Sequence, residues 1–286
     1  MTKQTRNVLR GYRGQLMKKT KDTDFSREHI AYLKKERQKK VIVHVCRCLI
    51  LIVILGFWEL FAGLKIIDPF ITSSPSRVIK TIGDLYGNGT LFFHIGVTLM
   101  ETLVGFLVAV LAGYAIAVVL WSSDAVRKVL EPYIVVLNSL PKIALGPLII
   151  IWIGTGYDAI IFMTVIVSII VCIMNMLSGF IAVDKTKLLL MKSMGANRLT
   201  TLTKLIIPAS LPALMNTLKV AVGLAWIGSI MGEYIVSKAG LGYLIVYGGQ
   251  VFKLDLVMTA TFILCALAGG MYGIISLIEK RVVKQY

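Results

Sequence analysis

Residues 93–121 read FHIGVTLMETLVGFLVAVLAGYAIAVVLW. Glu101 is the only Asp, Glu, Lys or Arg in this stretch. A helix needs about 20 apolar residues to cross a bilayer, so this stretch predicts a transmembrane helix. The rest of the chain agrees, since its 286 residues are 57% hydrophobic and 16% charged, with a mean hydropathy of +0.79. Soluble domains typically carry about 25% charge. The sequence therefore predicts an all-α polytopic membrane protein.

Further apolar stretches raise the expected number of transmembrane helices to about six. The others are residues 41–63, 133–154, 159–180, 213–236 and 256–278. The stretch 133–154 is interrupted by Pro141 and Pro147, and we expect a broken helix there. Of the connections, residues 122–132 are predicted to be a short turn, 237–255 a glycine-rich loop, and 75–85 an interfacial helix.

The basic residues give the expected orientation. Of the 31 Lys and Arg residues, 24 fall in segments that are cytoplasmic if the N-terminus is inside, and 5 fall in the outer loops. Positive charge gathers on the cytoplasmic side of membrane proteins, so both termini are predicted to be cytoplasmic. Residues 1–40 are expected to form a basic cytoplasmic arm, and residues 41–286 the membrane domain. The net charge of +16 is then explained by topology and by contact with anionic lipid, and we expect no nucleic-acid partner.

The sequence lacks the motifs of a membrane enzyme or of a nucleotide-binding chain. It has no H-E-x-x-H, no G-x-S-x-G and no G-x-x-x-x-G-K-[ST]. The three histidines, His29, His44 and His94, are too scattered for a metal site. We therefore expect no catalytic residue, no metal and no cofactor on this chain.

The polar segment 181–212 separates two apolar stretches. Its central part, with the residues just beyond it (185–213), reads KTKLLLMKSMGANRLTTLTKLIIPASLPA. The pattern predicts a helix, a turn at Gly195-Ala196, and a second short helix that stops at Pro208. This segment resembles the cytoplasmic coupling loop of permease subunits of binding-protein-dependent importers of the ATP-binding-cassette (ABC) class. Gly195, Leu205, Ile207 and Pro208 fall at the spacing of that motif, while residues 189–191, Leu-Leu-Met, replace its Glu-Ala-Ala.

Four other blocks resemble the nitrate, sulfonate and taurine subgroup of these permeases. They are residues 71–86, 98–106, 139–156 and 225–245. Glu101 departs from the subgroup, in which many members are expected to have a basic residue at that position. The similarity extends over roughly residues 65–280.

The resemblance implies a type I importer permease in a prokaryotic plasma (inner) membrane. It implies pairing with a second copy of the chain, an extracytoplasmic substrate-binding protein, and two separate ATPase subunits that hold ATP and Mg²⁺. The solute would be a small anion or zwitterion such as a sulfonate, taurine or nitrate, or a vitamin precursor. The residues implied at the ATPase contact are Lys192, Gly195, Ala196, Arg198, Leu205, Ile207 and Pro208.

Polar residues inside transmembrane segments are costly and are therefore candidates for the translocation pathway. The candidates are Glu101, Asn138, Lys142, Asn175, Trp226, Ser229 and Glu233. The alternative for each is an interhelical hydrogen bond or snorkelling to an interface. The pairs Gly228 with Gly232, and Gly269 with Gly273, have the spacing that permits close helix packing.

Two other classes of protein stay open at this point. A secondary transporter would work without an ATPase, but such proteins usually show inverted repeats and intramembrane carboxylates for coupling ions, and no such repeat is visible. A membrane-embedded enzyme or a scaffold is disfavoured by the missing catalytic constellation.

Overall fold

The computed structural model describes residues 27–64 and 66–282 and contains helices and no strands in these ranges. It divides into two units, residues 1–61 and 62–286. Residues 27–61 of helix α2, Arg27–Gly63, form the described part of the first unit. The helix continues without a break from residue 40 into the predicted first transmembrane segment. The remainder of the predicted basic arm, residues 1–26, lies outside the described residues.

The second unit is a bundle of long helices joined by short ones. Its helices are α3 (Pro69–Thr72), α4 (Pro75–Gly87), α5 (Leu91–Ser122), α6 (Asp124–Ser139), α7 (Gly146–Ile153), α8 (Tyr157–Ile181), α9 (Lys185–Ser193), α10 (Arg198–Thr201), α11 (Ile207–Val236), α12 (Leu241–Gln250) and α13 (Leu254–Val282). A 3₁₀ turn, Lys142–Leu145, precedes α7, and a π-helical segment, Leu202–Ile206, precedes α11.

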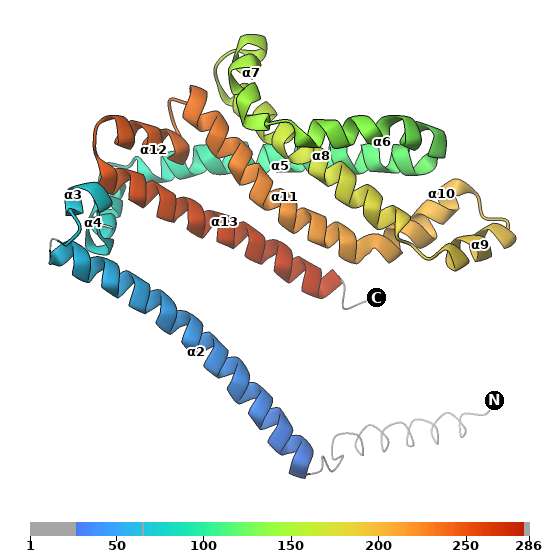
Figure 1. Ribbon diagram of the computed structural model, residues 1–286, viewed down its shortest axis with the longest axis horizontal. Helices are drawn as coiled ribbons and strands as arrows, with labels where there is room; N and C mark the ends of the chain where they lie inside the picture. The colour runs from blue at the N-terminus through green and yellow to red at the C-terminus, as the bar shows by residue number, and fades with distance from the viewer. Residues whose placement is uncertain (1–26, 65, 283–286) are drawn as a thin grey trace, which may run out of the picture. The chain divides into compact units, whose positions relative to one another are not determined.

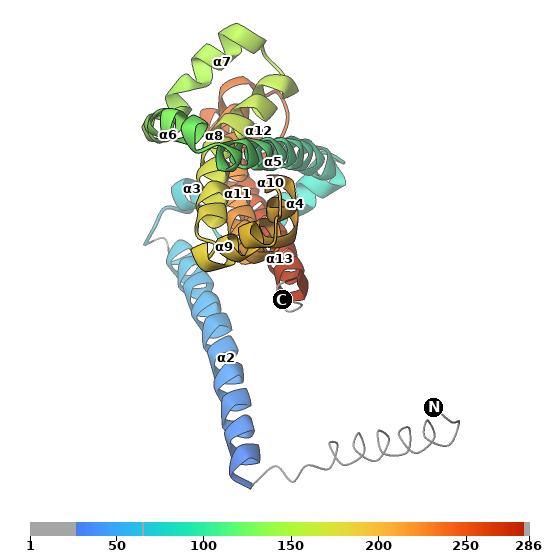
Figure 2. The same cartoon turned by 90° about the vertical axis from the view of Figure 1, so that its right-hand side faces the viewer.

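Helices α5, α8 and α11 pack against one another at the centre of this unit (Figures 1 and 2). Glycines allow the backbones to approach closely. A Cβ atom built at Gly228 of α11 would lie 2.6 Å from the Cα of Thr164 on α8, and one at Gly232 would lie 3.0 Å from the Cα of Ile160. The close packing predicted for this pair of glycines is confirmed. Gly269 and Gly273 of α13 have no atom within 4 Å of such a Cβ in the described chain.

The number of membrane-crossing helices agrees with the prediction. Within the described residues, five helical stretches are long and apolar enough to cross a membrane, and a bent pair, α6 with the stretch Lys142–Ile153, raises the number to six. The pair is bent by 85°. Pro141 lies at the bend, where its missing N–H and the strain it places on the preceding residue disfavour a continuous helix.

Two connections differ from the prediction. Residues 122–132 are not a short turn, because α6 begins at Asp124, with the Ser123 hydroxyl accepting from the Val126 N–H as its N-cap. Residues 237–255 are not a loop throughout, because the apolar run 241–247 forms most of α12. The glycines that indicated a loop lie at the start and the end of this helix, where glycine is tolerated.

The prediction that Pro208 stops a helix is wrong. Pro208 lies in the first turn of α11, and the helical path runs from Arg198 to Val236 without a break. The π-helical turn Leu202–Ile206 precedes Pro208, and such a local change of the backbone hydrogen-bond pattern lets a membrane helix continue past a proline. The second short helix of the loop therefore leads directly into a membrane-spanning helix.

Candidate functional site

Helices α9 and α10 form an exposed helical hairpin at the end of the bundle where α5 ends and α11 begins. Each helix has a side-chain N-cap: Asp184 accepts from the Thr186 N–H at 2.8 Å, and Asn197 accepts from the Thr200 N–H at 2.7 Å. Between the helices, Gly195 has φ +75°, a conformation that favours glycine. Local chemistry therefore fixes both helices and the turn that joins them.

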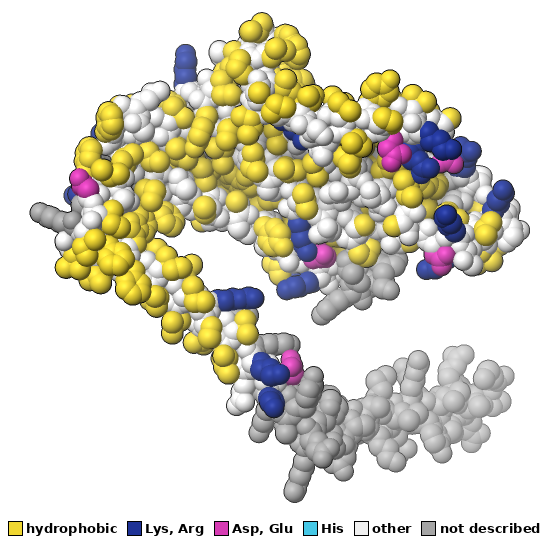
Figure 3. Space-filling model, viewed as in Figure 1, with side chains coloured by type: hydrophobic (Ala, Val, Ile, Leu, Met, Phe, Trp, Pro, Cys, Tyr) yellow, Lys and Arg dark blue, Asp and Glu magenta, His cyan; other side chains and the backbone are white. Residues whose placement is uncertain are grey.

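The hairpin has an apolar surface that the other described residues leave exposed. Leu189 and Leu190 of α9 are 66% and 59% exposed, Met194 in the turn is 74% exposed, and Leu199 of α10 is 69% exposed. Lys and Arg side chains gather around this end of the molecule (Figure 3). Apolar side chains that are clustered, exposed and surrounded by polar ones are typical of a protein–protein contact.

The predicted ATPase-contact residues divide into two groups. Lys192, Gly195, Ala196 and Arg198 are at least partly exposed on the hairpin, and the Arg198 guanidinium donates to the carbonyl of Ser122 at the end of α5. Leu205 and Ile207, in contrast, pack against the hydrophobic cluster around Phe180, Leu202 and Ile206. The hairpin is thus joined to the bundle core at the beginning of α11.

A cavity of about 760 Å³ lies between the hairpin and the ends of α5 and α8. Residues of the hairpin and of α5, α6 and α8 line this cavity, among them Trp121, Arg127, Phe180, Lys185, Lys192 and Arg198. Within the described chain, Arg127 has an ion pair with Asp124 at 2.9 Å. The cavity lining is therefore basic on balance.

Four of the predicted pathway residues lie on the faces of α5 and α11 that pack together. Glu101 of α5 is fully buried, and Trp226, Ser229 and Glu233 of α11 are buried as well. The carboxyl groups of Glu101 and Glu233 lie side by side. The structure therefore brings this part of the predicted set together, inside the helix packing of a single chain.

The other pathway candidates lie elsewhere. Lys142 donates to the carbonyl oxygen and to Oδ1 of Asn138, at 3.3 and 3.2 Å, across the bend between α6 and α7. Asn175 is partly exposed on α8. A pathway role for all seven residues remains a prediction.

The beginning of α12 is held by side chains of two other helices. The N–H groups of Gly242 and Tyr243 donate to Glu233 Oε2 at 2.6 and 3.2 Å. The Leu241 N–H donates to Thr98 Oγ1 at 2.7 Å, and the Gly240 N–H donates to His94 Nδ1 at 3.0 Å. The first N–H groups of a helix lack partners within it, and here four in succession are satisfied from α5 and α11.

Sequence reasoning missed this arrangement because it treated residues 237–255 as a loop. A glycine, Gly240, directly before the apolar run 241–247 is a sequence signal for a helix start that could have been used. Nothing in the local sequence indicates that His94 and Thr98, over 140 positions away, supply the caps.

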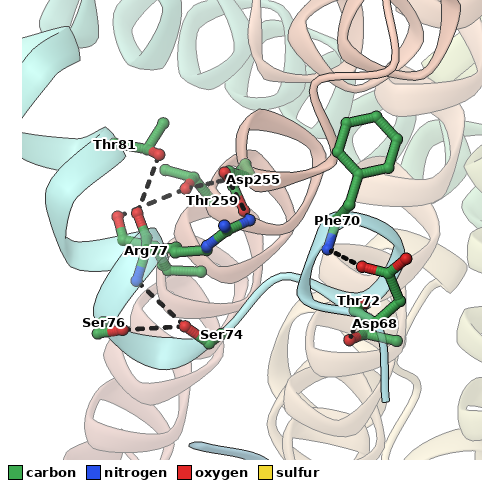
Figure 4. Close-up of polar contacts among 10 residues, drawn as sticks. Asp68, Phe70, Thr72, Ser74, Ser76, Arg77, Thr81, Asp255 and Thr259 are labelled. Carbon is green, nitrogen blue, oxygen red and sulfur yellow. Dashed lines mark hydrogen bonds and ion pairs between the residues drawn. The ribbon is translucent and has the colours of Figure 1, made fainter. Parts of the chain in front are cut away.

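At the same end of the bundle, α4 lies against the beginning of α13 (Figure 4). Arg77 of α4 has an ion pair with Asp255 of α13 at 3.6 Å, and Thr259 donates to the carbonyl of Val78 at 3.5 Å. A cavity of about 770 Å³ opens beside these residues and is also lined by Asp84 and Lys253. The predicted interfacial helix is confirmed as a helix, and it forms one wall of this cavity.

Comparison with known proteins identifies the architecture. The model of the family "Binding-protein-dependent transport system inner membrane component" matches residues 105–284. The chain belongs to this family. A probable ABC transporter permease protein of Haemophilus influenzae is 32% identical to this permease, over 78% of this chain and 91% of its own length.

Two further relatives agree with this assignment. The taurine transport system permease protein TauC of Escherichia coli is 26% identical over 76% of this chain and 81% of its own length. Among solved structures, the inward-facing MetNI methionine ABC transporter matches with a TM-score of 0.61 and 18% identity, over 68% of this chain and 96% of the matched chain. The permease thus has the type I importer fold and is a multi-pass inner-membrane component of a binding-protein-dependent transport system.

Proposed function

We propose that this permease forms the membrane path of an ATP-driven importer for a small anion or zwitterion such as a sulfonate, taurine or nitrate, or for a vitamin precursor. A second copy of the chain completes the path. Two ATPase subunits hold ATP and Mg²⁺ and hydrolyse the nucleotide, and an extracytoplasmic binding protein delivers the solute. The similarity to a taurine permease supports the substrate class.

The exposed apolar surface of the α9–α10 hairpin is the observation that carries the proposal. Leu189, Leu190, Met194 and Leu199 would each bury apolar area against a soluble partner, at about 25 cal/mol for each Å² removed from water. Leu189 and Leu190 occupy two of the three positions of the missing Glu-Ala-Ala. The proposed contact with the ATPase is therefore more apolar than the family motif would make it.

The connection of the hairpin to the bundle supports transmission of motion. Because Leu205 and Ile207 are packed into the core and the helical path continues into α11, a displacement of the hairpin moves the start of a membrane-spanning helix. In the proposed cycle, closure of the ATPase dimer displaces the hairpins of both copies, and the bundle alternates between inward and outward access.

The proposal is tested by ATPase and uptake measurements on the permease reconstituted in liposomes with the ATPase and binding protein encoded beside it. Gly195→Pro replaces a residue at φ +75° whose N–H donates to the Lys192 carbonyl at 3.0 Å. We expect stimulation of ATPase activity by the loaded binding protein to fall by about tenfold or more, within the range of allosteric coupling. Sulfonates, nitrate, pyrimidines and flavins form the substrate panel.

Gly89→Pro is the matched control. Gly89 has φ +70°, its N–H donates to the Tyr86 carbonyl at 3.0 Å, and its turn lies at the opposite end of the bundle. The same backbone change there should leave stimulation intact. An equal loss in both variants would contradict the coupling role, and uptake without any ATPase would support a secondary transporter.

A further inference from the structure

The carboxyl pair of Glu101 and Glu233 is buried inside the helix bundle. The two residues are 0% and 1% exposed, on helices α5 and α11, which are packed together. Their carboxyl groups are adjacent. Among the described residues, the ion pairs Arg77–Asp255, Arg127–Asp124 and Lys219–Glu279 include neither member of this pair.

Two ionised carboxylates in contact at such a site would be strongly unfavourable. Each buried charge is costly to desolvate when nothing compensates it, and like charges in contact raise the cost further. A proton shared by the two groups removes one of the charges and turns the repulsion into a hydrogen bond.

The hydrogen bonds around the pair favour a negative charge on Glu233 over one on Glu101. Glu233 Oε2 accepts two backbone N–H groups at the start of α12, and amide donors at a helix N-terminus stabilise a negative charge. Both oxygens of Glu101, and Oε1 of Glu233, have no hydrogen-bond donor among the described residues. The Thr98 hydroxyl also lies within reach of the Glu233 carboxylate, and a hydroxyl on Glu101 would add a second donor without disturbing the bonds to α12.

We propose that Glu101 and Glu233 form a binding site for a single proton, in which the Glu101 carboxylic acid donates to the Glu233 carboxylate. The bound proton keeps Glu233 in position to hold the N-terminus of α12 on α5 and α11. The proton comes from hydronium of the aqueous phase, so one O–H bond of hydronium breaks, water leaves, and an O–H bond forms on Glu101. Glu101 is then a positioning residue that acts through Glu233. This role explains why an acidic residue is tolerated where a basic one is expected in many members of the subgroup. The proposal does not depend on the substrate or on the ATPase.

Other titratable groups near the pair are compatible with this assignment. His94 Nδ1 accepts the Gly240 N–H, so this nitrogen carries no proton, and the His94 ring lies against Tyr243, with centroids 6.2 Å apart. Tyr234 follows Glu233 directly on α11. None of these groups supplies a positive charge to the pair in the described arrangement.

The test is infrared spectroscopy of the full-length permease in lipid nanodiscs at neutral pH, where exposed glutamates are ionised. A protonated carboxylic acid has a carbonyl stretch that a carboxylate lacks and that shifts in D₂O. We expect this band in the wild type and its loss in Glu101→Gln. Glu279→Gln is the control, because Glu279 has an ion pair with Lys219 and should contribute no such band.

Thermal unfolding of the same samples gives a second measurement. The amide of Glu101→Gln can donate to Glu233 in place of the hydroxyl, so its unfolding midpoint should stay near that of the wild type, whereas Glu101→Ala should lower the midpoint by a few degrees or more. A wild-type spectrum without the acid band, an unchanged band in Glu101→Gln, or a Glu101→Gln protein that is no more stable than Glu101→Ala or does not fold would each overturn the proposal.

Discussion

Gly228 lies where α11 approaches the backbone of α8. A Cβ atom at this position would be 2.6 Å from Thr164 Cα and 3.3 Å from the Met163 carbonyl oxygen, and backbone atoms cannot move aside as a side chain can. We expect Gly228→Ala to destabilise the fold by about 1–3 kcal/mol, the usual cost of overpacking. Thermal unfolding in detergent measures this effect.

Gly223 provides the control on the same helix. A Cβ atom at Gly223 meets nothing within 4 Å, so Gly223→Ala should leave the unfolding midpoint almost unchanged. If both variants were equally stable, the close packing of α11 on α8 would not be a stabilising feature of the fold.

At the scale of single elements, the start of α9 depends on an ionised side chain. The backbone N–H of Thr186 donates to Asp184 Oδ1 at 2.8 Å and thereby holds the pKa of this carboxyl below its ordinary value. A lowered pKa means that the folded helix start binds a proton less readily than the unfolded chain does. Its stabilising contribution is therefore complete above the ordinary pKa and is lost as the pH falls through the lowered one.

We expect the amides of α9 to exchange faster, after correction for intrinsic rates, as the pH falls through this range. Asp184→Asn keeps a side-chain oxygen that can cap the helix but removes the titration. Hydrogen exchange measured by mass spectrometry should then show little pH dependence in residues 185–193. Persistence of the same dependence in Asp184→Asn would assign it to another group.

The π-helical segment Leu202–Ile206 and the first turn of α11 show how an element can differ from its sequence signal. Pro208, near the start of α11, indicated a helix end. The helix continues past Pro208 because the π-helical turn before it changes the backbone hydrogen-bond pattern. Residues on both sides of Pro208, Leu202 and Ile206 before it and Leu214 after it, are buried in one hydrophobic cluster.

At the scale of the whole molecule, the basic residues predict the sidedness of the bundle. The α9–α10 hairpin should face the cytoplasm, and the turn that contains Asn88, between α4 and α5, should face outward. In a cysteine-free background, a membrane-impermeant maleimide should label Asn88→Cys in intact cells. It should label Lys187→Cys only after the cells are permeabilised, and the opposite result would reverse the assigned topology.

The sequence by itself determined the helical class, the positions of the long apolar helices and the hairpin with its turn at Gly195. These features depend on local composition, on the length of apolar sequence needed to cross a bilayer, and on the backbone preferences of Gly and Pro. Each of these can be read from a short segment of sequence. The coupling-loop motif at residues 189–208 also depends on spacing within one segment. The family match over residues 105–284 confirms the family to which these features pointed.

Only the tertiary structure decided which polar residues meet. Glu101 and Glu233 are 132 positions apart in the sequence, and they become neighbours because glycines let α5 and α11 pack closely against α8. The start of α12 is held by His94, Thr98 and Glu233, so its formation depends on contacts between distant segments. Side-chain pairing across packed helices depends on their rotation and register, and no local pattern in the sequence specifies these.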